Sequence, residues 1–261
     1  LAADAMDPDV VAQIFHVKGR PATNPLIVHV SDESMARTLA SEWPDIAQKA
    51  ADAFWPGPLT LVVPKADAVP DIVTAGGRTV ALRCPSLNVT HQLIKLSQRP
   101  LAAPSANRSE AVSPTTAQPV LEGLGNRIGM ILDNGPCEHG LESTVLDCTV
   151  DPPKVLRPGP ISSEQLAEAL GTNVCSSESE PAGAGQGSAA DTVLRSPGTQ
   201  QLHYAPRTQL TLSEDAPSVI PQLIQDGHRV GWLCNFPEDN AVQTLATVSY
   251  THLRAHETFA N

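Results

Sequence analysis

Short apolar runs recur along the first part of the chain, and each run ends at proline, glycine or a small polar residue. Runs of this length, bounded in this way, are typical of β-strands with little exposed surface. They predict strands at residues 26–30, 59–63, 80–84, 101–103, 128–132, 143–147 and 154–157.

Apolar residues spaced three or four positions apart predict helices between several of these strands. The first helix begins at Asp7 as N-cap, with Pro8 at its first position and an apolar face over residues 10–15. Others are expected at 32–40, 44–54, 87–96 and 162–170, the last from the capping box of Ser162 and Gln165. Because strands and helices do not alternate strictly, we predict an α/β fold with a mixed parallel and antiparallel sheet.

The pattern changes after residue 171, where Ser, Glu, Gly and Ala follow one another without a period. This composition predicts a linker. We expect a first domain over residues 1–171, the linker over 172–207, the start of a smaller α/β domain over 208–248 and a non-native tail over 249–261. Within the second domain we expect strands at 209–212 and 229–234 and a helix at 217–225. Because the chain begins at Leu1 within a loop-like stretch, we also expect a gene fragment.

Composition and charge narrow the classes of function. The 261 residues carry a formal net charge of −11, which argues against a broad nucleic-acid-binding surface. The five cysteines form no C-x-x-C pair, so we expect neither a disulfide framework nor a zinc site, and a reducing cytosol fits best. No apolar run reaches the length of a membrane span.

The segment Lys18-Gly19-Arg20-Pro21 is the strongest candidate for a binding site. Lysine supplies a point charge and arginine a planar fork, a pair that suits phosphate, and glycine permits a close approach of the backbone. The alternative interpretation is a solvated helix end, where the helix dipole favours basic residues.

Other polar or cationic groups stand at the ends of predicted strands, where open α/β sheets bind ligands. Taken singly, each also fits an edge-strand charge, a turn or a helix cap. They are Thr79 and Arg83, the segment A-P-S-A-N at 103–107, Ser113, and E-S-T-V at 142–145 with Arg157. His29, on a strand, is on composition alone a packed core histidine.

Taken in order, these pieces resemble the YrdC-like threonylcarbamoyl-AMP synthases. The motifs are K-G-R-P-x-x-N-P-L-I-V-H, W-P-G-P-L-T, R-C-P, A-P-S-A-N-x-S, E-S-T-V and L-R-P-G. The later S-P-G and H-Y-A-P resemble the longer members, which have a C-terminal domain. The resemblance implies a twisted mixed sheet flanked by helices, then a linker and a small Rossmann-like domain. It also implies that a first strand, with a threonine contact, precedes Leu1 and is missing.

The family makes threonylcarbamoyl-AMP and pyrophosphate from L-threonine, bicarbonate and ATP with Mg²⁺, for the threonylcarbamoyl modification of adenosine 37 in tRNA. The resemblance therefore implies a downstream tRNA threonylcarbamoyl transferase as partner, with tRNA itself an indirect one. It implies that Lys18, Arg20 and Asn24 hold the ATP phosphates and that the first two supply the charge for catalysis. The nucleotide site would be completed by Thr79, Ser105, Asn107, Ser113 and Arg157, with Tyr204 as a lid. The threonine site would be lined by His29, Arg83, Ala103 and Ser143.

Two other functions stay open. One is a YrdC-like module of a carbamoyl-transfer maturation factor, which would carry zinc-finger cysteine pairs and an acylphosphatase-like region; neither is visible in the sequence. The other is a non-enzymatic RNA-binding module, against which the net charge of −11 speaks.

Overall fold

The computed structural model describes residues 1–109, 111–138, 140–176, 213 and 215–230. Contacts between Cα atoms divide the chain into two units, Leu1–Tyr204 and Ala205–Asn261. In the second unit the described part contains helix α8 (Ala216–Gln225), close to the predicted 217–225. The expected strand at 209–212 lies outside the described residues, as does all of 229–234 except residues 229 and 230, which form no strand.

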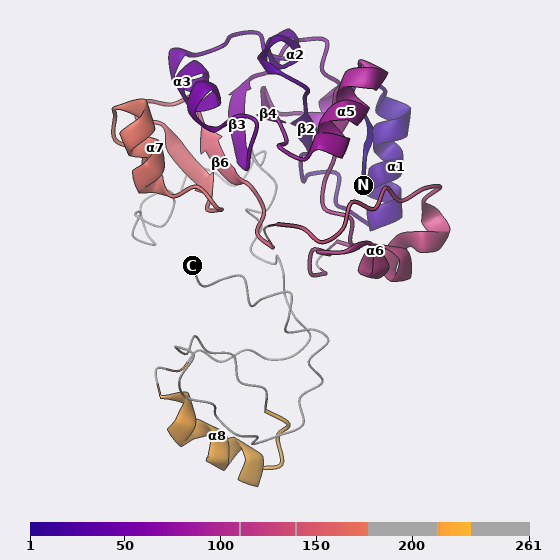
Figure 1. Cartoon of the computed structure of the whole chain (residues 1–261), viewed down its shortest axis with the longest axis vertical. Coiled ribbons are helices and arrows are strands. Elements are labelled where there is room, and N and C mark those ends of the chain that lie inside the picture. The colour runs from indigo at the N-terminus through magenta and orange to yellow at the C-terminus, as the bar shows by residue number, and fades with distance from the viewer. Residues whose placement is uncertain (110, 139, 177–212, 214, 231–261) are drawn as a thin grey trace. The chain divides into compact units, whose positions relative to one another are not determined.

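The first unit is built on a mixed sheet, as predicted (Figure 1). Its eight strands within the described residues have the order β1-β5-β2-β4-β3-β6-β7-β8. The parallel pairs are β2–β4, β3–β6 and β7–β8, and the other neighbours are antiparallel. The strands are β1 (Ala3–Asp4), β2 (Ile27–His29), β3 (Leu59–Pro64), β4 (Thr79–Arg83), β5 (Leu101–Ala102), β6 (Thr144–Asp147), β7 (Lys154–Arg157) and β8 (Cys175–Ser176).

Two helices of this unit begin at their predicted caps. Asp7 caps the first helix by accepting from the backbone N–H of Asp9 and Val10, and Ser162 and Gln165 form the expected capping box. Helices α4 and α6 were not predicted. The helices are α1 (Pro8–Lys18), α2 (Glu33–Thr38), α3 (Asp45–Phe54), α4 (Asp71–Thr74), α5 (Asn88–Ser97), α6 (Ala117–Leu124) with a 3₁₀ turn (Gly125–Arg127), and α7 (Ser163–Leu170).

The strand predicted at 128–132 is wrong. These residues pair with no strand in the described part of the chain, and the side chains of Met130 and Leu132 are 75% and 53% exposed. An apolar run indicates a strand only where a neighbouring strand supplies hydrogen bonds and a covering layer buries its side chains.

The two faces of the sheet differ, because side chains alternate along each strand. One face carries the main core, where Val28, Leu61 and Leu82 pack against apolar residues of α1, α2, α3, α4 and α7. The opposite face carries a much smaller apolar cluster of Ile27, Val62, Ala81 and Val145. That second face, which we call the site face, is where the strands can present polar side chains.

Candidate functional site

Lys18 joins the end of α1 to the loop that follows β5. Gly19 ends the helix with a backbone in the left-handed region, at φ 64°, so the chain leaves the helix axis directly after Lys18. The Lys18 ammonium, which has three N–H donors, lies 2.5 Å from Ser105 O, 2.6 Å from Asn107 O and 3.1 Å from Asn107 Oδ1. The structure therefore brings together two motifs that lie almost 90 residues apart in the sequence.

Arg20 is held by the turn that leads into β2. Its Nε donates to Asn24 O at 3.0 Å, and its Nη2 donates to Asn24 Oδ1 at 2.6 Å and to Pro25 O at 2.7 Å. The planar guanidinium is thus fixed beside Asn24 by contacts within the motif itself.

One row of paired residues crosses the site face over five strands. Because paired residues on neighbouring strands point to the same face, the row gathers side chains from distant parts of the sequence. Its members in strand order are His29, Arg83, Thr60, Val145 and Arg157, each paired with the next.

Ser143 and Arg157 lie together at one end of this row. Arg157 Nε and Nη2 donate to Ser143 O at 3.1 and 2.9 Å, and Nη2 also donates to Ser143 Oγ at 3.1 Å. Ser143 Oγ lies 2.8 Å from Thr60 Oγ1, and Arg157 Nη1 pairs with Glu142 Oε2. The segment E-S-T-V and Arg157 are thus joined by a network of direct contacts.

Burial lowers the pKa of Lys18, His29 and Arg83. The pKa of Lys18 falls to about 8, first because of burial and then because Arg20 is near, while Glu142 raises it. Lys18 is therefore charged below about pH 8 and loses its charge above it. Burial, and after it the charge of Arg83, lowers the pKa of His29 to about 3, so this imidazole is neutral at physiological pH. The buried His29 Nδ1 has no hydrogen-bond partner among the described residues.

The remaining predicted residues occupy different places around the site face. Thr79 lies on the same face as Arg83 but at the other end of β4, roughly 13 Å away at about 3.3 Å per residue. Ala103 N donates to Ile27 O at 3.0 Å, and Ser113 Oγ donates to Glu142 Oε1 at 3.4 Å. Tyr204, the expected lid, lies outside the described residues.

Two residues of the site, Thr60 and Glu142, were assigned no role from the sequence. Thr60 is fully buried between Arg83 and Val145 in the row, and Glu142 contacts Arg157 and Ser113. Both belong to quoted motifs, W-P-G-P-L-T and E-S-T-V, but only strand pairing reveals their neighbours.

The described residues contain no group of three or more His, Cys, Asp or Glu that could hold a metal ion. Over the same ranges, none of the helices has the length and apolar character needed to cross a bilayer.

Two family models match the chain. Residues 1–159 match the Sua5–YciO–YrdC model, described as "Telomere recombination", and residues 161–260 match one described as "Threonylcarbamoyl-AMP synthase, C-terminal domain".

Similar proteins include two curated threonylcarbamoyl-AMP synthases. The one from Pyrococcus abyssi is 42% identical over 226 residues, covering 87% of this chain and 64% of the relative. The one from Bacillus subtilis is 43% identical over 239 residues, covering 89% and 66%. A crystal structure of P. abyssi Sua5 complexed with L-threonine matches with a TM-score of 0.76 at 40% identity, covering 87% of this chain and 66% of that chain. The chain thus spans slightly less than two thirds of each of these proteins.

Proposed function

The chain belongs to the Sua5–YciO–YrdC family, and on that premise we propose that it is an L-threonylcarbamoyladenylate synthase. The reaction joins L-threonine, bicarbonate and ATP into threonylcarbamoyl-AMP and releases pyrophosphate. The observation that carries this proposal is the direct contact between motifs that lie far apart in the sequence and are expected in one active site. Lys18 bonds to Ser105 and Asn107, all expected at the nucleotide, and Arg157 bonds to Ser143 on the same sheet face as Arg83.

The chemistry requires positioning and charge neutralisation more than a covalent nucleophile. The threonine amine and bicarbonate first give a carbamate and water. A carbamate oxygen then bonds to the α-phosphorus, while the bond from that phosphorus to the β-phosphate oxygen breaks and pyrophosphate leaves. Arg20 and Arg157, with Lys18 below about pH 8, would offset the negative charge on the phosphates.

The two substrates are assigned to different sets of residues. The nucleotide would take Lys18, Arg20 and Asn24 for its phosphates, and Thr79, Ser105, Asn107, Ser113 and Arg157 elsewhere, with Tyr204 as lid. The threonine would take His29, Arg83, Ala103 and Ser143. Arg83 suits the threonine carboxylate, which a guanidinium can bind through two parallel hydrogen bonds.

The proposal also covers Mg²⁺, the partner proteins and the cellular location. Magnesium would arrive with ATP, because it commonly takes most of its ligands from substrate phosphates and water, and the described residues contain no cluster of three or more metal-ligating side chains. No described residue is assigned to it. We further propose a cytoplasmic location, a tRNA threonylcarbamoyl transferase as consumer of the product, and the domain boundaries expected from the sequence.

A labelling experiment tests the activity. The chain is incubated with ATP, threonine and labelled bicarbonate, and the nucleotides are separated. We expect label in an adenylate and release of pyrophosphate in equal amount. Absence of label from the adenylate, in this chain and in a version extended to the length of its relatives, would contradict the proposal.

Arg20→Ala is expected to weaken ATP binding about tenfold or more, since a charge-assisted hydrogen bond is worth roughly 1.5–3 kcal/mol. AMP binding should change less, because AMP lacks the β- and γ-phosphates that the arginine is proposed to contact. Titration calorimetry with both nucleotides measures the difference. The matched control is Lys49→Ala, which removes an exposed cation from α3. An equal loss for ATP, AMP and threonine would indicate misfolding instead.

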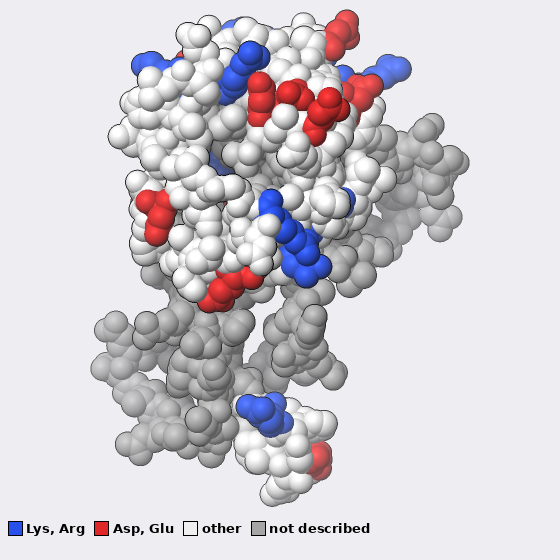
Figure 2. Space-filling model, turned by 90° about the vertical axis from the view of Figure 1, so that its right-hand side faces the viewer, with Lys and Arg blue, Asp and Glu red and all other residues white. Residues whose placement is uncertain are grey.

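The RNA-binding alternative has less support. On the face seen in Figure 2, Lys and Arg stand in small separate groups with Asp and Glu between them. A surface that binds nucleic acid usually gathers its basic residues in one stripe or patch. A filter-binding titration with tRNA, with and without ATP, separates the two functions.

A further inference from the structure

Glu142 lies two residues before β6, and its carboxylate contacts residues from two other parts of the chain. Its Oε2 pairs with Arg157 Nη1, and its Oε1 accepts a hydrogen bond from Ser113 Oγ at 3.4 Å. The side chains of Arg157 and Glu142 are only 9% and 24% exposed. Because the pair is largely shielded from water, it constrains the guanidinium more firmly than a surface ion pair would.

The same carboxylate acts on the other cations of the site. It raises the pKa of both Lys18 and Arg83, against the lowering that burial causes. At first sight a carboxylate is unfavourable here, because it repels the phosphates and the threonine carboxylate that the site is proposed to bind. Its presence therefore indicates a role that is exerted through its partners.

We propose that Glu142 is a positioning residue of the nucleotide site, which holds the Arg157 guanidinium and the Ser113 hydroxyl in the arrangement that ATP requires. The inference rests on the proposed function, since Arg157 and Ser113 are assigned to the nucleotide there. Glu142 thereby links the loop before α6 to the end of β7, two segments that are far apart in the sequence.

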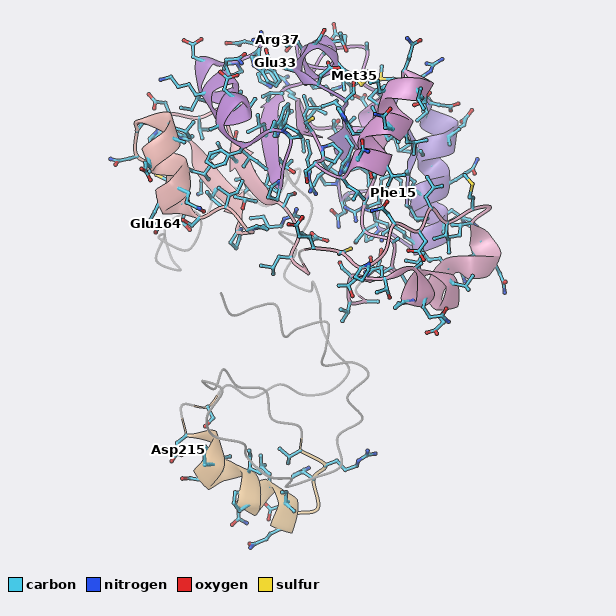
Figure 3. The ribbon with its side chains drawn as sticks, viewed as in Figure 1. Phe15, Glu33, Met35, Arg37, Glu164 and Asp215 are labelled. Carbon is cyan, nitrogen blue, oxygen red and sulfur yellow. The ribbon has the colours of Figure 1, made fainter. Side chains whose placement is uncertain are left out.

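Glu142→Gln tests this role, because glutamine keeps the size of the side chain and an acceptor oxygen but removes the charge. ATP affinity, measured by calorimetry on the full chain, should fall roughly tenfold or more. The melting temperature should fall as well, because the buried Arg157 keeps its charge without a charged partner, so ATP affinity is measured well below the unfolding transition. The matched control is Glu33→Gln, which breaks the ion pair between Glu33 Oε1 and Arg37 Nε (2.6 Å) on α2 (Figure 3). That pair lies on a helix over the core face, so ATP affinity should stay at the wild-type value.

A double-mutant cycle shows whether Glu142 acts through Arg157. Arg157→Gln alone should weaken ATP binding. The double variant Glu142→Gln, Arg157→Gln should bind ATP no more weakly than Arg157→Gln alone, because residues in one network are not additive. Additive losses would overturn the inference, since they would mean that Glu142 acts independently of Arg157.

The pH profile gives a measurement that a purely structural role would not change. Wild-type ATP affinity should decline as pH rises through about 8, where Lys18 loses its charge. The charged groups that act with Lys18 are Arg20 and Glu142, with the amino group of Leu1 also near. Because Glu142 raises the pKa of Lys18, the decline in Glu142→Gln should begin at a lower pH. An unchanged profile would count against the inference.

The outcomes separate the inference from the proposed function. If the wild-type chain binds no ATP, both fail. If Glu142→Gln binds ATP as tightly as wild type, or more tightly, the inference alone fails, because the carboxylate would then only repel. Should Glu142→Gln not fold, Glu142→Asp replaces it: a carboxylate one methylene shorter cannot reach both partners, so ATP affinity should fall in a folded protein, and wild-type affinity would overturn the inference.

Discussion

Gly159→Ala is expected to lower the melting temperature and abolish ATP binding together. A Cβ at this position would lie 2.4 Å from Thr144 N, 2.6 Å from Glu142 O and 2.7 Å from the carbonyl carbon of Ser143. All three are backbone atoms, so no side chain can rotate away, and the start of β6 must move from the end of β7. Overpacking of this kind costs about 3 kcal/mol or more, which corresponds to a fall of roughly 6–12 °C in melting temperature for a domain of this size.

ATP binding should be lost because the displaced segment is the one that holds Arg157. The matched control is Gly123→Ala, in the last turn of α6, where a Cβ would meet no atom within 4 Å. That variant should be neutral or slightly stabilised, since alanine favours a helix by about 1 kcal/mol over glycine. Thermal unfolding and calorimetry on both variants give the comparison. A Gly159→Ala protein with wild-type melting and ATP affinity would refute the close approach of β6 and β7.

Arg83→Lys is expected to raise the threonine concentration needed for half-maximal activity at least about tenfold. Arg83 is paired between His29 and Thr60 in the row, and its Nε donates to Gly57 O at 3.1 Å. That contact orients the guanidinium, so the opposite edge of the fork can receive a carboxylate. Lysine keeps the charge but cannot reproduce two parallel hydrogen bonds.

Steady-state kinetics at saturating ATP measures the effect. The melting temperature and ATP affinity of Arg83→Lys should remain near wild type. The control, Arg37→Lys, changes an arginine on α2 whose side chain is 47% exposed, and surface substitutions usually alter stability by less than about 0.5 kcal/mol. If Arg83→Lys works at wild-type threonine concentrations, the threonine carboxylate binds elsewhere.

Local sequence patterns predicted most of the first unit because its elements carry their own signals. Strands β3, β4 and β7 lie within one residue of their predicted ends, since each has apolar residues at its centre and is closed by proline or a polar residue. Helices α1 and α7 follow from their caps. The run at 128–132 misled the prediction because hydrophobicity reports the composition of a segment and not the presence of a pairing strand.

The contacts between site residues were harder to predict than the motifs to which those residues belong. The contacts of Lys18 with Ser105 and Asn107 join two quoted motifs, so each could be recognised separately. Thr60 and Glu142 differ, because their importance depends on neighbours that come from strand register and from Ser113, which lies 29 residues before Glu142 in the chain. Such non-local pairings cannot be read from local spacing.

The row from His29 to Arg157 exists only while the strands keep their register, so the face on which each polar side chain lies depends on the number of residues in its strand. A deletion of a single residue inside β4 would turn Arg83 towards the apolar core and bring Leu82 onto the site face, since alternate residues point to opposite faces. A point substitution changes one contact of this site. An insertion or deletion of one residue within a strand instead moves every following side chain of that strand to the opposite face of the sheet. Variation in length among descendants of this sequence should therefore collect in the connections between strands, where it leaves the register intact.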